Sequence, residues 1–154
     1  MILAFARRLP KETGINPQKV IFCHMDSYNM GMGNPTVHIS KDGYDLTLPE
    51  ELCKLGYNIG FDTWSRVSGS NEETEYALDV RMKMLMDMVS RGWVHQISLG
   101  HDMMSKGDGV QNGRGGYITW PEKLKTLVRQ RAITKEDFDI LTVDNPARIL
   151  TVTK

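Results

Sequence analysis

Three ionisable side chains stand where short apolar runs end, namely His24, Asp62 and Asp102. They are 38 residues apart (24 to 62) and then 40 residues apart (62 to 102). Neutral imidazole and carboxylate are common ligands of zinc and similar metals, and a carboxylate can also accept the proton of a metal-activated water. The pattern therefore favours one chemical site built from three distant parts of the chain.

Their positions in the sequence leave two interpretations open for His24 and two for Asp102. His24 closes an apolar run where strand stability does not call for an imidazole, so it is a metal ligand or a partly buried histidine bonded to a loop. Asp102 is a metal ligand and general base, or it caps the turn at 103–104. The two residues together favour the site, because the carboxyl ends of neighbouring parallel strands point to one centre.

Asp62 and three further residues are candidates for a supporting role. Asp26 and Asp62 are each either an acceptor that orients a metal ligand or an ordinary turn residue. Arg66 follows the second apolar run and either lines a substrate pocket or lies on a solvated loop. His101 precedes Asp102 and is predicted to contact substrate or a ligand.

The elements that must position these residues alternate between strand and helix. Apolar runs at this spacing predict parallel strands over 19–24, 57–62 and 95–100. Helical periodicity and terminal signals predict helices over 2–9, 48–55, 72–91, 120–130 and 134–142. The longest of them carries an apolar stripe of Ala77, Val80, Met84, Leu85 and Met88.

Several residues mark where these elements begin and end. Pro10 is expected to cut the first helix, and 25–45 is expected to be a long irregular segment. Thr134 and Asp137 have the spacing of a capping box at the start of 134–142. Asn145 is expected to cap a last helical turn that has Pro146 in its first position.

Length and composition bound the class of protein. The 154 residues suit one domain, and the formal net charge of +0 gives no argument for nucleic acid or an anionic membrane as partner. The sequence has no apolar run near the roughly 20 residues of a membrane span. Cys23 and Cys53 fall in a predicted strand and a predicted helix, which favours a reduced cytoplasmic chain over a disulfide.

Four segments in order resemble a known family, namely VIFCHMD at 20–26, GYNIGFDT at 56–63, ISLGHD at 97–102 and NPARIL at 145–150. Together they resemble the end of phosphotriesterase-family proteins, which are amidohydrolase-type metal-dependent hydrolases. The resemblance covers nearly the whole chain. Each motif is moderately specific, and the argument comes from their order and spacing.

The resemblance implies a (β/α)₈ barrel with a two-metal site, usually zinc or a similar divalent ion. His24 matches the histidine that ends the sixth strand and ligates one metal. Asp102 matches the aspartate that ends the eighth strand, ligates the other metal and handles the proton of the bridging hydroxide, while Asp62 matches the acidic end of the seventh strand. The implied reaction is attack of metal-bound hydroxide on an ester, lactone or phosphoester.

The chain departs from the family upstream of position 19. It lacks the His-x-His pair of the first strand, the bridging lysine or glutamate of the fourth and the histidine of the fifth. Residues 1–154 are therefore expected to form the C-terminal part of a barrel, incomplete alone because such a barrel needs about 250 residues. The chain would then be a fragment, pair with a complementing N-terminal half, or fold as an open α/β layer.

Two functions from different classes follow from this expectation. The first is a metal-dependent hydrolase to which this chain supplies one ligand for each metal. The second is a catalytically inactive half-barrel that self-associates or binds a partner chain through its open strand edges. A flavodoxin-like nucleotide binder is disfavoured, because the first predicted strand is not followed by a glycine-rich turn.

Overall fold

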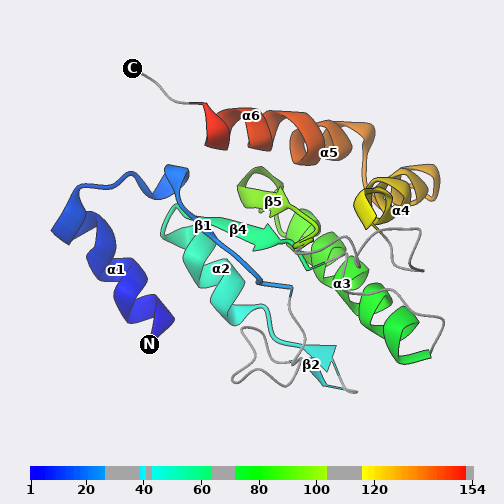
Figure 1. The fold of residues 1–154 in the computed structure, drawn as a ribbon, viewed down its shortest axis with the longest axis horizontal. Helices are drawn as coiled ribbons and strands as arrows, with labels where there is room; N and C mark the ends of the chain where they lie inside the picture. The colour runs from blue at the N-terminus through cyan, green and yellow to red at the C-terminus, as the bar shows by residue number, and fades with distance from the viewer. Residues whose placement is uncertain (27–38, 41–42, 64–71, 104–115, 152–154) are drawn as a thin grey trace.

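A three-stranded parallel sheet organises the computed structural model, which describes residues 1–26, 39–40, 43–63, 72–103 and 116–151. The sheet has the order β1-β4-β5, with β1 at Ile21–Phe22, β4 at Asn58–Phe61 and β5 at Ile97–Leu99 (Figure 1). Phe22 lies opposite Ile59, and Phe61 lies opposite Leu99. The predicted α/β class with three parallel strands is confirmed.

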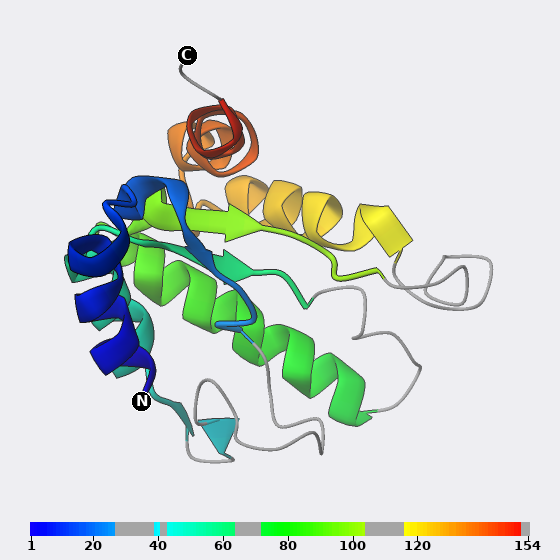
Figure 2. The same ribbon diagram turned by 60° about the vertical axis from the view of Figure 1, so that its left-hand side comes forward.

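Helices connect and cover these strands. Between β4 and β5 runs α3, which lies on one side of the sheet in Figure 2, while α4 to α6 lie on the other. The helices are α1 (Ile2–Thr13), α2 (Thr47–Lys54), α3 (Glu72–Ser90), α4 (Thr119–Arg129), α5 (Lys135–Asp139) and α6 (Asn145–Leu150). Short 3₁₀ turns occupy Pro17–Lys19, Val94–Gln96 and Gly116–Ile118.

The core forms where one face of the sheet meets these helices. Tyr57, directly before β4, and Ile59 and Phe61 within it are fully buried, because alternate residues of an extended segment share a face. Most of the predicted apolar stripe of α3 packs in the same core, through Val80, Met84, Leu85 and Met88. The side chain of Ala77 lies outside the described part of the chain.

The strands are shorter than the apolar runs predict. The run 19–24 pairs only at Ile21–Phe22, because a 3₁₀ turn precedes it and His24 has a φ of 60°. The run 95–100 begins with the 3₁₀ turn Val94–Gln96 and pairs only at Ile97–Leu99. An apolar run in the sequence indicates which residues are buried. The pairing between strands, in contrast, ends wherever φ and ψ of the backbone leave the β region.

The prediction that Pro10 ends the first helix is wrong. Helix α1 runs through Pro10 to Thr13 and ends at Gly14, which has a φ of 70°. Proline at this position has no N–H to donate to the carbonyl of Ala6. That carbonyl instead accepts a hydrogen bond from the hydroxyl of Tyr57 at 2.7 Å. Tyr57 lies directly before β4, so a side chain from outside the helix replaces the missing helical hydrogen bond.

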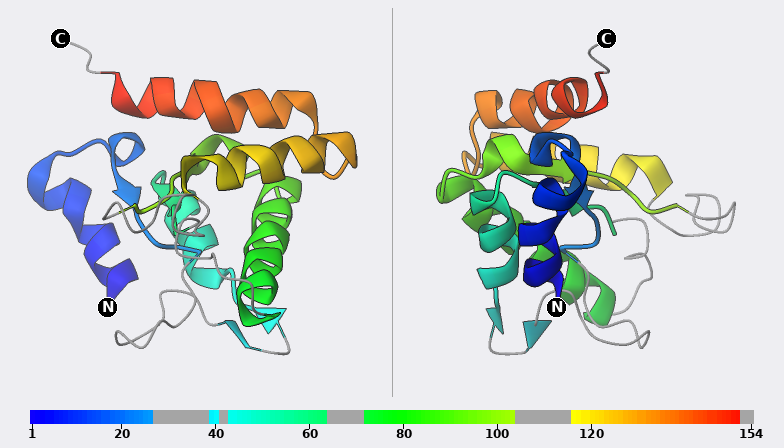
Figure 3. Two further views of the ribbon diagram at one scale, coloured as in Figure 1. Left: turned by 45° about the vertical axis from the view of Figure 1, so that its right-hand side comes forward. Right: turned by 90° about the vertical axis from the view of Figure 1, so that its left-hand side faces the viewer.

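The C-terminal helix also differs from its prediction. Helix α5, the π-helical turn Ile140–Asp144 and α6 follow without a break and form one rod beside α4 (Figure 3, left). The capping box of Thr134 and Asp137 is confirmed.

Asn145 is not a cap. Its backbone is helical, and its side-chain amide donates to the carbonyls of Val94 and Ile97 at 2.7 and 2.8 Å. Pro146 is the second residue after the π-helical turn, and the helix continues through it despite the missing N–H of the proline.

A small hairpin lies within the segment 25–45 that the sequence predicts to be irregular. Strands β2 (Ile39–Ser40) and β3 (Gly43–Tyr44) pair antiparallel, and two-residue strands are too short to leave a periodic pattern. The Tyr44 hydroxyl donates to Asp87 of α3 at 2.5 Å. Burial and this hydrogen bond raise the pKa of Tyr44 to about 12. Residues 27–38 of the segment lie outside the described part of the chain.

Two remaining expectations concern the membrane and the cysteines. Across the described ranges, every helix is too short or too polar to cross a bilayer. Both cysteines are free, with Cys23 exposed and Cys53 buried in the core. Burial raises the pKa of Cys53 to about 12, so its thiol stays protonated at neutral pH.

The Tyr57–Ala6 bond can be tested through the proline that makes it necessary. We expect Tyr57→Phe to lower the free energy of unfolding by about 1–3 kcal/mol, because a buried carbonyl loses its donor. Adding Pro10→Ala supplies an N–H for the same carbonyl and should recover part of that loss. Urea unfolding of the four proteins in this double-mutant cycle measures the coupling. An identical effect of Pro10→Ala with and without the Tyr57 hydroxyl would contradict the assignment.

Candidate active site at the carboxyl edge of the sheet

The ends of β1 and β4 meet through a direct contact between His24 and Asp62. The Nδ1 atom of His24 lies 2.8 Å from Oδ1 of Asp62, and the same oxygen accepts the backbone N–H of His24 at 2.9 Å. When Asp62 is ionised and the imidazole is neutral, Nδ1 carries the proton and Nε2 keeps its lone pair, because a carboxylate only accepts. The imidazole is half exposed, which leaves Nε2 available to chemistry at this edge.

The backbone of His24 makes this contact possible. Strict alternation would place His24 on the same face as Phe22, whose ring packs edge-on against Tyr57 in the core at 5.0 Å. The φ of 60° at His24 turns the chain out of the strand conformation. The Met25 N–H then bonds the Gly60 carbonyl at 2.9 Å and holds the turned segment against β4. A non-glycine residue in this conformation is strained, and such strain concentrates at functional sites.

Two glycines make room for Asp62. A Cβ at Gly60 would lie 2.6 Å from Oδ2 of Asp62 and 3.1 Å from the Cα of Cys23. A Cβ at Gly100 would lie 2.9 Å from the Cβ of Asp62. Side chains larger than hydrogen at either position would push the carboxylate away from His24.

The side chain of Asp26 accepts a hydrogen bond from the backbone of Asp62. Its carboxylate is fully buried and accepts the N–H groups of Asp62 at 3.1 Å and of Thr63 at 3.2 Å. Burial raises the pKa of Asp26 to about 6, against the opposing effect of the Arg81 guanidinium. The carboxylate is therefore an acceptor that fixes the backbone just after β4, and its role in orienting a metal ligand stays a prediction.

Arg81 was not predicted from the sequence to belong to the site, and it is the one arginine or lysine that is buried within the described part of the chain. The arginine is 2% exposed, and its Nε donates to the Asp26 carbonyl at 3.0 Å and to the Thr63 hydroxyl at 3.1 Å. A signal was present, because position 81 falls between Val80 and Met84 on the apolar stripe of α3. A charged residue on such a stripe must be paired or must serve a purpose.

Asp102 ends the third strand segment in the same strained manner as His24, with a φ of 50°. The Gly100 N–H bonds the Phe61 carbonyl at 3.0 Å, which brings this segment beside the end of β4. Burial and the charges of Asp62 and Asp102 together raise the pKa of the Cys23 thiol. The electrostatic fields of all three strand ends therefore overlap at one edge of the sheet.

His101 forms a cluster with two aromatic side chains. Its Nδ1 accepts the indole N–H of Trp120 at 2.9 Å, and its ring meets that of Tyr117 edge-on at 5.4 Å. Burial lowers the pKa of His101 and so favours the neutral imidazole. The cluster includes the residue directly before Asp102, and the contact of His101 with substrate or a ligand stays a prediction. Arg66, the other predicted contact, lies outside the described residues.

The residues that the structure describes do not make a metal site by themselves. Within those ranges, His, Cys, Asp and Glu side chains never gather in threes in a geometry that could hold an ion. A stable zinc site needs three or four protein ligands. His24 and Asp102 would therefore require further ligands from outside the described ranges.

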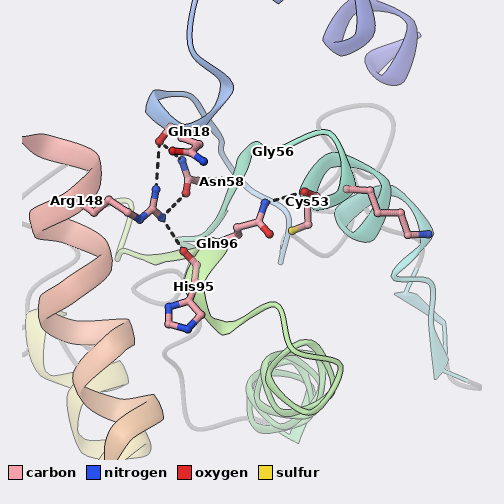
Figure 4. A pocket seen from close by; sticks show the side chains of 8 residues that line it. Gln18, Cys53, Gly56, Asn58, His95, Gln96 and Arg148 are labelled. Atoms are coloured by element: carbon pink, nitrogen blue, oxygen red, sulfur yellow. Dashed lines mark hydrogen bonds between the residues drawn. The ribbon is translucent and has the colours of Figure 1, made fainter.

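A pocket of about 420 Å³ lies at the opposite edge of the sheet, where the strands begin (Figure 4). Arg148 points into it and donates to the Asn58 side chain at 2.7 Å and the His95 carbonyl at 2.6 Å. Gln96 donates from the same pocket to the carbonyls of Cys53 and Tyr57, both at 2.8 Å. The Arg148 bonds tie α6 to the strand starts, whereas the Gln96 bonds join the start of β5 to α2 and to the start of β4. None of the predicted site residues lines this pocket.

Comparison with known proteins identifies relatives along most of the chain. Residues 7–150 match the model of the phosphotriesterase family. A phosphotriesterase-related protein of Drosophila mojavensis is 25% identical over 118 residues, which are 73% of this chain and 33% of that protein. An N-acetyltaurine hydrolase of Salmo salar is 27% identical over 148 residues, which are 94% of this chain and 38% of that protein.

Solved structures share the fold. An organophosphorus hydrolase from Deinococcus radiodurans superposes with a TM-score of 0.64 at 19% identity, covering 97% of this chain and 42% of that one. A mutant of a phosphotriesterase-like lactonase from the same organism gives a TM-score of 0.64 at 20% identity, covering 97% and 44%. The three strands and their helices thus match part of a (β/α)₈-barrel fold, and the chain spans less than half the length of these relatives.

The packing around Asp62 predicts the outcome of enlarging Gly100. We expect Gly100→Ala to lower the free energy of unfolding by about 1–3 kcal/mol, because the new methyl group overlaps the Cβ of Asp62. Urea unfolding measures the loss, and Ser98→Ala is the control, since it adds no volume to the same strand. Combining Gly100→Ala with Asp62→Gly removes the overlapping Cβ and should restore part of the stability. No recovery in that pair would contradict the steric account.

Proposed function

This chain belongs to the phosphotriesterase family, and on that premise we propose that it forms the C-terminal part, strands six to eight, of a metal-dependent hydrolase barrel. The observation that carries the proposal is the parallel pairing that brings the strand ends bearing His24, Asp62 and Asp102 to the same end of the sheet. The carboxyl ends of the strands are where barrels of this kind place their chemistry. The reaction we assign is hydrolysis of an ester, lactone or phosphoester.

Each candidate residue receives a role in this proposal. His24 offers Nε2 as a ligand to one divalent metal, because Nδ1 is held by Asp62. Asp102 is a ligand to the second metal and the catalytic group that accepts a proton. Asp26 and Asp62 orient His24, while His101 and Arg66 contact substrate. The metal, usually zinc in such sites, would supply an activated water when bound.

The proposed site is shared with residues beyond strands six to eight. One ligand from His24 and one from Asp102 fall short of the three or four that each zinc ion needs. We assign the missing ligands to a complementing N-terminal half, on the same polypeptide or on a second one. Two free cysteines are consistent with a reducing compartment, and we place the protein in the cytoplasm.

A second candidate function is a catalytically inactive half-barrel that self-associates or binds a partner chain. The observation that favours it is the state of the sheet, in which the outer strands β1 and β5 pair on one side only among the described strands. Unpaired parallel edges are templates for association. This candidate predicts a defined assembly that neither binds a divalent metal nor hydrolyses these substrates.

Metal content and turnover separate the two candidates. We expect the protein that contains both halves of the site to retain divalent metal after zinc-replete purification, and His24→Ala and Asp102→Ala each to reduce its metal content. Elemental analysis of the purified protein measures the metal, and light scattering measures the mass of the assembly. His95→Ala is the matched control, because His95 lies at the opposite edge of the sheet.

Activity is measured with an aryl ester, a lactone, a phosphotriester and N-acetyltaurine, the last because curated relatives carry that name. We expect turnover of at least one substrate that falls at least 100-fold in Asp102→Ala, since a lost metal ligand and proton acceptor acts on the chemical step. Absence of both metal and turnover in the zinc-replete protein rules out the hydrolase. A defined oligomer in the same experiment favours the inactive half-barrel.

A further inference from the structure

Arg81 is buried at a cost that stability alone does not explain. The side chain is 2% exposed within α3, between apolar residues of the core. Burial lowers the pKa of Arg81, while Asp26 acts in the opposite direction. Within the described part of the chain its Nη1 atom is buried and has no hydrogen-bond acceptor. Replacing a buried ion pair by apolar residues is often neutral or stabilising, so this pair is better explained by what it holds in place.

The guanidinium joins two loops to one helix. A single atom, Nε, donates to the Asp26 carbonyl at 3.0 Å and to the Thr63 hydroxyl at 3.1 Å. The same nitrogen lies 3.6 Å from the Asp26 carboxylate. Asp26 belongs to the loop after β1, and Thr63 belongs to the loop after β4. Arg81 therefore holds both loops at a fixed distance from α3.

The contacts continue from these loops to the imidazole. The Asp26 carboxylate accepts the N–H groups of Asp62 and Thr63 and so fixes the backbone at the end of β4. Asp62 in turn holds His24 through both the backbone N–H and Nδ1. Arg81 and His24 are thus connected by a series of hydrogen bonds whose donor–acceptor distances lie between 2.8 and 3.2 Å.

We propose that Arg81 is a positioning residue of the site, which sets the orientation and tautomer of His24 through Asp26, Thr63 and Asp62. It touches neither the imidazole nor any reacting atom, and it acts only through these three residues. The proposal rests on the proposed function for the chemical use of His24. The coupling between Arg81 and His24 is a property of the chain itself and is tested without metal or substrate.

The test uses the imidazole nitrogen signals of His24, read by NMR on the metal-free protein and assigned with a His24→Gln variant. In the parent protein we expect the Nδ1-protonated tautomer to predominate, because Asp62 accepts that proton. Arg81→Met keeps the length and apolar body of the side chain and removes the guanidinium. We expect it to shift the His24 signals toward a mixture of tautomers, while the signals of His95 stay unchanged.

Two further variants keep the test decisive if Arg81→Met does not fold. Arg81→Lys keeps the charge but loses the Nε that donates to both loops, and Thr63→Val removes one acceptor of that Nε at nearly constant volume. We expect both to shift the His24 signals, with a smaller shift for Thr63→Val. Thr142→Val, which removes a hydroxyl remote from the network, is the matched control.

The outcomes distinguish positioning from mere packing. Unchanged His24 signals in a folded Arg81 variant overturn the proposal, even if that variant is less stable, because a packing role lowers stability without altering the imidazole. Unchanged signals in folded Thr63→Val overturn it as well when neither Arg81 variant folds. In the assembled protein, the same variants should weaken metal affinity by about 10–100-fold. A shifted tautomer together with no metal binding would sink the proposed function and leave the positioning role standing.

Discussion

The single oxygen Oδ1 of Asp62 joins the first two strand ends, and the arrangement of this edge of the sheet depends on it. It accepts both the backbone and the imidazole of His24, while the N–H of Asp62 is held by the buried carboxylate of Asp26. The contact requires that β1 and β4 pair in parallel and that Gly60 and Gly100 carry no side chain. The strand register, the strained backbone of His24 and the packing of the two glycines therefore all contribute to the position of the Asp62 carboxylate.

The sequence allows the strand ends to be predicted because burial leaves a pattern. Apolar runs at regular spacing locate β1, β4 and β5, and the stripe on α3 locates the longest helix. The exact extent of pairing is not predictable in this way, since φ at His24 and Asp102 ends each strand and an apolar run does not encode φ. The same limit applies to Pro10, whose missing hydrogen bond is replaced by Tyr57, a residue 47 positions away (10 to 57).

The roles of Asp26 and Arg81 cannot be predicted from the sequence, because their partners lie on distant segments of the chain. Asp26 could be suspected from its place two residues after His24, but its acceptor role depends on N–H groups that follow β4. Arg81 leaves only the mark of a charge on an apolar stripe, and its partners lie on two other segments. The opposite edge follows the same rule, because Asn145 looks like a helix cap in the sequence and instead bonds the start of β5.

Among the described strands, the two outer strands of the sheet are not equivalent, and this has a consequence for the symmetry of an assembly. One edge is β1 and the other is β5, with all three strands running the same way. Copies that preserve this parallel direction can join only head to tail, β5 of one against β1 of the next. A pair of copies joined in this way still has one unused outer strand on each copy. The contact continues from copy to copy until the curvature of the sheet closes a ring, so the twist of three short strands would decide the stoichiometry of any assembly formed through them.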